Sequence, residues 1–259
     1  MSHGSDIGSE HIVFDSKAAA RQWVWDALQA EKLARFPFPP HGRIPNFADA
    51  RAAALRLLDE PPWRDARRIK VNPDSPQVHV REEALARGIR VYVPTPRLKG
   101  GFKLLDPDHI PADRFREAAT LKTMPAWSVA VALADMPQLD AIVTGCAAVT
   151  AGGKRAGKGE GYSDLEYAIL RELGHHPVPV AATVHDVQVV GDFPLEPNDI
   201  PLSVICTPTR IIRVAEPPPA PAGIDWSRLD DDDVKAMPVL EELRALRRRG
   251  TSQGPGVSS

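Results

Sequence analysis

The chain has 259 residues, 43% of them hydrophobic and 25% charged, which is the composition of a globular protein and excludes disorder throughout. Lys and Arg number 32 against 34 Asp and Glu, so a net charge of −2 gives the whole chain no attraction for nucleic acid or anionic lipid. No stretch approaches the roughly 20 apolar residues of a membrane span. Cys146 and Cys206 both lie in apolar runs, as is typical of a reducing compartment. We therefore expect a cytoplasmic protein, monomeric or homodimeric, without membrane or nucleic-acid partners.

Helical and strand patterns alternate along the chain. Apolar positions at helical spacing predict helices over residues 17–33, 47–58, 78–86, 113–119, 163–173 and 239–249. Short apolar, β-prone runs predict strands over residues 66–71, 89–93, 141–149, 178–183 and 202–207. Because a strand that returns through a helix pairs in parallel, this order predicts a parallel sheet. We interpret the polar segment 99–127 as an insertion or a lid.

The alternation predicts an α/β fold with three α/β/α layers and a mostly parallel, Rossmann-like sheet. We expect one domain over residues 15–214, preceded by a flexible N-terminus over 1–14. Prolines then mark a linker, which with a C-terminal helix covers 215–249, and residues 250–259 are expected to be disordered.

A glycine-rich segment lies between the strand over 141–149 and the helix over 163–173. Residues 151–164 read AGGKRAGKGEGYSD, with five glycines and the cations Lys154, Arg155 and Lys158. Such a loop brings backbone N–H groups and a helix N-terminus toward an anion, at the sheet edge where α/β proteins bind ligands. The segment predicts a phosphate-binding site.

Two familiar phosphate motifs do not fit this segment. Residues 152–158 have the spacing of a P-loop, but Gly159 stands where the magnesium-binding hydroxyl is required. Gly157, Gly159 and Gly161 are one residue short of the dinucleotide fingerprint.

The loop resembles that of the 5-formyltetrahydrofolate cyclo-ligases, also called methenyltetrahydrofolate synthetases. Residues 155–164, RAGKGEGYSD, are similar to the R-x-G-x-G-x-G-Y-Y-D loop of that family. Asn198-Asp199 before a strand, and Lys17 and Arg21 on the first helix, agree with it. Further segments look like one branch, the methenyltetrahydrofolate synthase domain-containing proteins, at residues 43–47, 72–77, 157–166 and 184–190.

The resemblance implies an enzyme that closes a ring at the expense of ATP, with Mg²⁺ as cofactor. 5-Formyltetrahydrofolate would become 5,10-methenyltetrahydrofolate, with ADP and phosphate released. By that resemblance, Arg155 and Lys158 would be catalytic, and Asp164 and Asp199 would hold magnesium. The residues expected to bind ATP are Lys17, Arg21, Gly153, Lys154, Arg155, Gly157, Lys158, Gly159, Gly161 and Tyr162.

The expected substrate side departs from the family pattern. Asp74, Arg97, Tyr162 and His185 are the expected substrate-binding residues, and Asp74 stands where the family has glutamate. Ser163 replaces the second tyrosine of the loop. Two alternatives therefore stay open: a relative that binds nucleotide or RNA without turnover, and an enzyme that phosphorylates another small acceptor.

Overall fold

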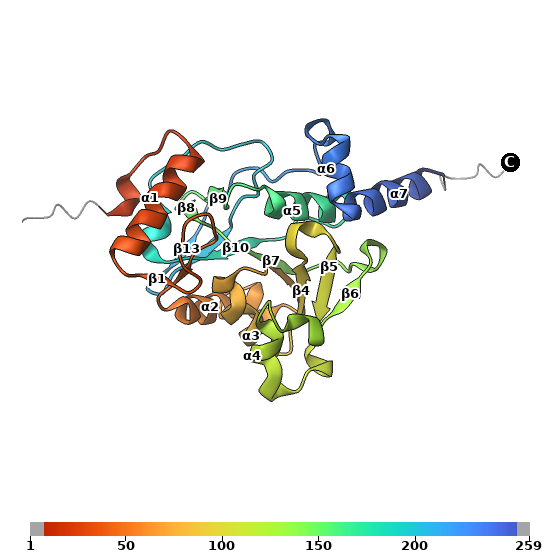
Figure 1. Cartoon of the computed structure of the whole chain (residues 1–259), viewed down its shortest axis with the longest axis horizontal. Coiled ribbons are helices and arrows are strands. Elements are labelled where there is room, and N and C mark those ends of the chain that lie inside the picture. The colour runs from red at the N-terminus through yellow and green to blue at the C-terminus, as the bar shows by residue number, and fades with distance from the viewer. Residues whose placement is uncertain (1–7, 253–259) are drawn as a thin grey trace, which may run out of the picture.

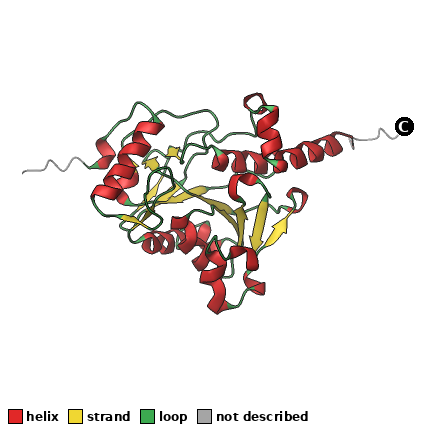
Figure 2. Cartoon of the chain, in the orientation of Figure 1, coloured by secondary structure: helices red, strands yellow, loops and turns green. Residues whose placement is uncertain are grey.

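The computed structural model describes residues 8–252, and within them the chain folds into three layers (Figure 1). An eight-stranded sheet with the order β13-β12-β10-β7-β3-β4-β5-β6 lies in the middle, with helices on both faces (Figure 2). The α-helices are α1 Lys17–Ala30, α2 Ala50–Leu58, α3 Val78–Ala86, α4 Phe115–Ala119, α5 Tyr162–Glu172, α6 Asp231–Ala236 and α7 Pro238–Ser252.

The main sheet is built from β3 Arg68–Val71, β4 Arg90–Pro94, β5 Phe102–Leu105, β6 Val129–Val131, β7 Ala141–Thr144, β10 Val180–Thr183, β12 Val204–Cys206 and β13 Ile211–Arg213. The five central strands, from β12 to β4, are parallel, and the three at the edges are antiparallel. The expected α/β/α fold with a mostly parallel sheet is confirmed.

The two faces of the sheet bury different sides of the same strands. Ile69 and Val71 of β3 pack with α2, α3 and α4, which lie below the sheet in Figure 1. On the upper face, Ile142 of β7 packs with Ile169 of α5. Lys70 points to the same side as α5, because successive strand residues face opposite ways.

Smaller elements complete the described chain. β8 Ala148–Thr150, β9 Arg155–Ala156 and β11 Val189–Val190 form a three-stranded sheet, and β1 Ala34–Arg35 pairs with β2 Asn46–Phe47. Helix α1 is capped by Ser16, whose hydroxyl accepts a hydrogen bond from the Ala19 N–H. The buried face of α1 packs on the small sheet. Lys17 and Arg21, in the first two turns of α1, therefore lie near the loop that follows β9.

Backbone hydrogen bonds link residues 8–14, the described part of the expected flexible N-terminus, to the segment after β11. The Ile12 carbonyl accepts from Gly191 at 2.9 Å, and Phe14 donates to the Asp192 carbonyl at 2.9 Å. Of the expected disordered tail, residues 250–252 belong to α7. The rest of that tail and residues 1–7 lie outside the described residues.

Three expected boundaries were wrong. The strand over 141–149 divides at Gly145 into β7 and β8, which belong to different sheets. The helix over 47–58 starts only at Ala50, because Asp49 has a left-handed φ of 58°. Within the supposed insertion 99–127, Phe102–Leu105 pairs with β4 and extends the sheet. This strand has only four residues, and its polar and apolar residues do not alternate, so the sequence shows no clear strand pattern.

The C-terminal extension packs on the upper face of the sheet. Leu240 and Leu243 of α7 are fully buried beside Leu133 and Met136. Glu242 accepts a hydrogen bond from the Leu133 N–H at 2.8 Å. None of the helices that the structure describes is long and apolar enough to cross a membrane.

This packing makes Leu240→Ala a test of the docked extension. Removing a fully buried leucine side chain is expected to lower the free energy of unfolding by about 2–5 kcal/mol. Urea unfolding of the full chain measures the change. Leu195→Ala, at a position 40% exposed, serves as the control and is expected to cost much less. Equal effects of the two substitutions would contradict the docking.

Candidate functional site

A pocket of about 1170 Å³ opens at the carboxyl ends of the parallel strands. Strands β4 and β7 lie on opposite sides of β3, and their crossovers through α3 and α5 lie on opposite faces of the sheet. The strand order therefore reverses between β3 and β7, which is where open α/β sheets form a ligand crevice. The pocket is lined there by residues 72–75 after β3, 95–97 after β4, and 157–164 before and within α5.

The pocket wall is basic although the whole chain is not. Ten Lys and Arg residues line it against six Asp and Glu, whereas the chain has a net charge of −2. Positive charge gathered in a concave site attracts anionic ligands. The basic residues of the wall are Lys17, Arg21, Arg43, Arg81, Arg97, Arg116, Lys122, Arg155, Lys158 and Arg228.

The glycine-rich loop brings its backbone against two of these cations. A Cβ on Gly157 would lie 2.7 Å from Arg155 Nη2, so a larger residue there would displace that guanidinium. Gly159 has a φ of 104°, and a Cβ on it would lie 3.4 Å from Arg21 Nη2. Gly161, at φ 73°, immediately precedes α5, and the N-terminus of that helix lies at the pocket. The cradle suits a phosphate chain.

Among the residues that the structure describes, five of the six acidic residues of the pocket, all except Asp74, are paired with cations. Arg155 Nη1 lies 2.5 Å from Asp164 Oδ1, which also accepts from the Ile200 N–H at 3.0 Å. Lys17 Nζ lies 2.5 Å from Asp199 Oδ1. Burial tends to lower the pKa of Arg155, but Asp164, Cys146 and Asp199 together more than offset burial, so the pKa is raised and the guanidinium stays charged.

Asp164 and Asp199 suit a magnesium ion that arrives with its ligand. Both line the pocket, and carboxylate oxygens are the donors that Mg²⁺ prefers, supplemented by phosphate oxygens and water. No group of three or more His, Cys, Asp or Glu residues in the described part of the chain forms a complete protein metal site. These two residues therefore fit as a partial ligand set.

The structure gathers most of the predicted site residues on this pocket. Those that line it are Lys17, Arg21, Asp74, Arg97, Arg155, Gly157, Lys158, Gly159, Gly161, Tyr162, Asp164 and Asp199. Arg97 reaches the wall from a turn in which both it and Leu98 have left-handed φ values, 55° and 54°. Buried Leu98 anchors this strained turn in the core.

Gly153, Lys154 and His185 do not line the pocket, contrary to our expectation. Lys154 Nζ binds Asp192 Oδ1 at 2.7 Å and the Phe193 carbonyl at 3.2 Å. A Cβ on Gly153 would lie 2.6 Å from the Leu202 carbonyl oxygen, so only glycine lets the two backbone segments approach this closely. The β8–β9 turn thus faces away from the site.

His185 has a structural role. Its Nδ1 accepts from the Val187 N–H at 3.3 Å, and its ring packs edge-on against Phe47 with centroids 6.1 Å apart. Burial lowers the pKa of His185, which favours the neutral ring required of this acceptor.

Cys146 is a core residue rather than a nucleophile. Burial raises its pKa to about 11, despite the opposing influence of Arg155, so its thiol stays protonated near neutral pH. Burial likewise raises the pKa of Cys206 to about 12.

Sequence reasoning missed the polar layer at the base of the pocket. Lys70 and Glu166 form a buried ion pair, and Arg81 donates to the carbonyls of Asn72 and Ala119. Burial lowers the pKa of Arg81 to about 9. A lysine inside the apolar strand β3 was the one available signal, because a buried charge needs a partner.

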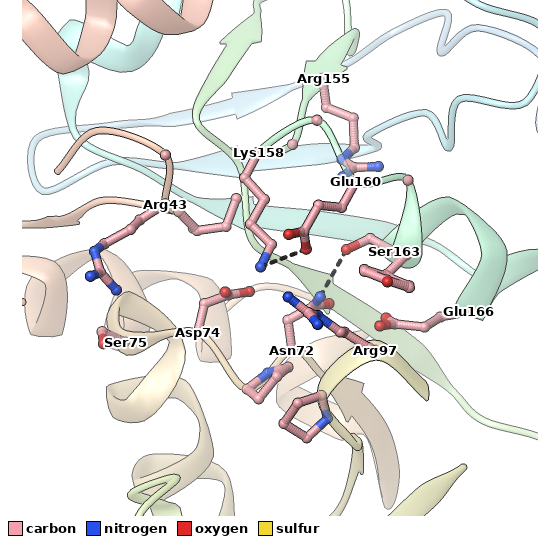
Figure 3. Close-up of a pocket in the computed structure, with 18 of the residues that line it drawn as sticks. Arg43, Asn72, Asp74, Ser75, Arg97, Arg155, Lys158, Glu160, Ser163 and Glu166 are labelled. Carbon is pink, nitrogen blue, oxygen red and sulfur yellow. Dashed lines mark hydrogen bonds and ion pairs between the residues drawn. The ribbon is translucent and has the colours of Figure 1, made fainter. Parts of the chain in front are cut away.

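Asp74 lies against the opposite wall of the pocket from the glycine-rich loop. A Cβ on Gly145 would lie 2.8 Å from Asp74 Oδ2, so the glycine that ends β7 makes room for this carboxyl. Figure 3 shows Lys158 extending toward Asp74, with Glu160 2.8 Å from the Lys158 ammonium. Burial raises the pKa of Asp74, although Lys158, Arg81 and Lys70 oppose the shift.

A raised pKa means that ionised Asp74 destabilises the fold relative to protonated Asp74. Asp74→Asn is therefore expected to raise Tm at neutral pH, where the wild-type carboxyl is driven toward ionisation. The gain should shrink as pH falls through the raised folded-state pKa and should be gone below the unfolded-state pKa of about 3.9, because both states are then protonated. Thermal unfolding from pH 3 to pH 8 measures this. Asp113→Asn, at a side chain 77% exposed, is the control, and an equal gain there would contradict the explanation.

Comparison with known proteins extends these observations. A sequence profile of the 5-formyltetrahydrofolate cyclo-ligase family matches residues 15–208. The methenyltetrahydrofolate synthase domain-containing protein of Bos taurus is 41% identical over 236 residues, covering 88% of this chain and 62% of that protein. Its namesake from Homo sapiens is 38% identical over 241 residues, covering 90% and 63%. The chain thus spans less than two thirds of the length of these relatives.

A solved structure shares the fold. The 5,10-methenyltetrahydrofolate synthetase of Aquifex aeolicus superposes with a TM-score of 0.50 at 17% identity, covering 77% of this chain and 93% of that chain. The 5-formyltetrahydrofolate cyclo-ligase of Escherichia coli K12 is 32% identical over 76 residues, covering 29% of this chain and 40% of that protein. The profile match covers more than half of the chain, so this protein belongs to the 5-formyltetrahydrofolate cyclo-ligase family.

Proposed function

We propose that this chain catalyses the ATP- and Mg²⁺-dependent conversion of 5-formyltetrahydrofolate into 5,10-methenyltetrahydrofolate, with release of ADP and phosphate. The observation that carries the proposal is the position of the family's loop. Residues 155–164 lie on a basic pocket at the point where the strand order reverses. A volume of about 1170 Å³ exceeds that of a typical single-ligand pocket and leaves room for two ligands.

One end of the pocket suits the nucleotide phosphates. Lys17 and Arg21 from α1 meet the loop glycines and the N-terminus of α5 there, and Lys158 extends over the cavity. We assign the phosphates to these groups. Asp164 and Asp199 would hold magnesium, which when bound neutralises phosphate charge. The other end, with Asp74 and Arg97, would take the folate.

Little covalent chemistry is required of the protein. The formyl oxygen attacks the γ-phosphorus as ADP leaves. N10 then attacks the formyl carbon, the carbon–oxygen bond breaks to release phosphate, and the N10 proton is lost to solvent. Both steps depend on positioning and on fixed positive charge. Arg155 is buried and held by Asp164, so its charge needs no reorganisation as the reaction proceeds. Within the described part of the chain, the one ion pair of Lys158 is with the half-exposed Glu160, and an incoming phosphate can replace that partner.

Lys158→Ala tests the site with a matched control in the same loop. The substitution removes a pocket cation and is expected to lower kcat/KM for ATP by about a hundredfold. Lys154→Ala removes a cation that faces Asp192 instead, and turnover is expected to stay near that of the wild type. Both are preferable to Arg155→Ala, which would leave Asp164 without its buried partner and risk unfolding.

The assay follows methenyltetrahydrofolate by absorbance and phosphate release in parallel, with MgATP and 5-formyltetrahydrofolate. Equal activity of Lys158→Ala and Lys154→Ala would contradict the assigned phosphate site. ATP bound without any product in the wild type would favour the non-catalytic nucleotide-binding alternative. ATP turnover that 5-formyltetrahydrofolate does not stimulate would favour another acceptor.

A further inference from the structure

Three polar side chains connect the buried centre of the sheet to the pocket wall. Lys70 of β3, which is 1% exposed, donates from Nζ to Asn72 Oδ1 at 2.8 Å. Asn72 Nδ2 in turn donates to Ser163 Oγ at 2.9 Å, drawn as a dashed line in Figure 3. Asn72 and Ser163 both line the pocket, whereas Lys70 lies beneath it. We call these three residues the relay.

The direction of each hydrogen bond in the relay is fixed by chemistry. An ammonium group has donors only, so the oxygen of the Asn72 amide must face Lys70. The amide NH₂ must then face Ser163, and Ser163 Oγ must accept. On its other side, Lys70 forms the buried ion pair with Glu166.

This leaves the hydroxyl hydrogen of Ser163 for a partner outside the relay. A serine in the first turn of a helix has two common partners, a backbone carbonyl one turn earlier and a ligand at the helix N-terminus. Within residues 8–252, the Ser163 hydroxyl donates no hydrogen bond to a protein acceptor. Its side chain is half-buried on the pocket wall, beside Arg97 in Figure 3.

We propose that the relay orients the Ser163 hydroxyl as a hydrogen-bond donor to an oxygen of the formylated folate. The inference rests on the proposed function and adds a specificity-determining contact to it. Ser163 lies in the first turn of α5, next to the phosphate cradle, and its hydroxyl is turned toward Asn72. Asn72 belongs to the same segment as Asp74, and the turn that carries Arg97 packs against α5, so we assign the hydroxyl to the folate rather than to ATP. Asn72 is a positioning residue.

Ser163→Ala, Asn72→Asp and the double variant test the relay. Ser163→Ala removes the donor and is expected to weaken 5-formyltetrahydrofolate binding about tenfold. Asn72→Asp replaces the amide by a carboxylate that presents acceptors to both neighbours, so the serine hydroxyl turns toward it and the ligand loses the same donor. The double variant is therefore expected to bind no more weakly than Asn72→Asp alone. Ser163→Thr keeps the hydroxyl and should retain most of the affinity.

Calorimetric titration with 5-formyltetrahydrofolate, and separately with a non-hydrolysable ATP analogue, gives the two affinities. The relay predicts that only the folate affinity changes in Ser163→Ala. Unchanged folate affinity, additive losses in the double variant, or a loss confined to the ATP analogue would each overturn the assignment.

A second measurement separates the relay from the proposed function. Wild-type protein that binds ATP but no formylated folate would overturn both the proposed reaction and the folate contact. The hydrogen bond between Asn72 and Ser163 is tested without ligand. Urea unfolding of the wild type, the two single variants and the double variant gives the four free energies of unfolding. A coupling free energy between positions 72 and 163 supports the hydrogen bond between them, and additive effects overturn it.

Discussion

The buried ion pair between Lys70 and Glu166 determines how the two halves of the site meet. Lys70 lies in the central strand β3, and Glu166 lies one turn into α5. The pair fixes the start of α5 over the carboxyl end of β3, and the glycine-rich loop directly precedes that start. An apolar pair of similar volume would often be as stable, whereas removing one charge alone is costly. The charges therefore specify one placement of the helix, and the pocket depends on that placement.

Pairing of a cation with a carboxylate also occurs along the pocket wall. Asp164 neutralises Arg155, Asp199 neutralises Lys17, and Glu160 neutralises Lys158. Concentrated cations repel one another in a site of reduced dielectric constant, and interleaved carboxylates limit that repulsion before an anionic ligand binds. The pairs differ in burial, from the enclosed Arg155 to the half-exposed Lys158. Buried cations give fixed charge, and exposed ones can exchange their partners.

Much of the fold could be predicted because its signals are local. The strands β3 and β4 and the helix α3 between them follow from apolar periodicity and from Gly88, and the loop chemistry of 157–164 follows from its glycines and cations. The site predictions that were wrong or missing concern residues whose positions depend on tertiary structure. Lys154 and Lys158 look equivalent in sequence, yet the β8–β9 turn points one away from the pocket. Asn72 gives no signal of its own, since its role comes from Lys70 and Ser163, 2 and 91 residues away.

The extension after β13 changes what counts as the functional unit of this chain. Its backbone binds α5 where Ile224 donates to Glu172, a residue that also pairs with Arg247, and Arg244 stacks on Trp226. These contacts bring Arg228 to the rim of the pocket, although the family profile ends at residue 208. A chain cut at that boundary would expose apolar surface around Leu133 and lose one cation of the wall. The edge of the pocket and the edge of the family profile thus differ, and one part of the pocket wall depends on a segment that the profile does not include.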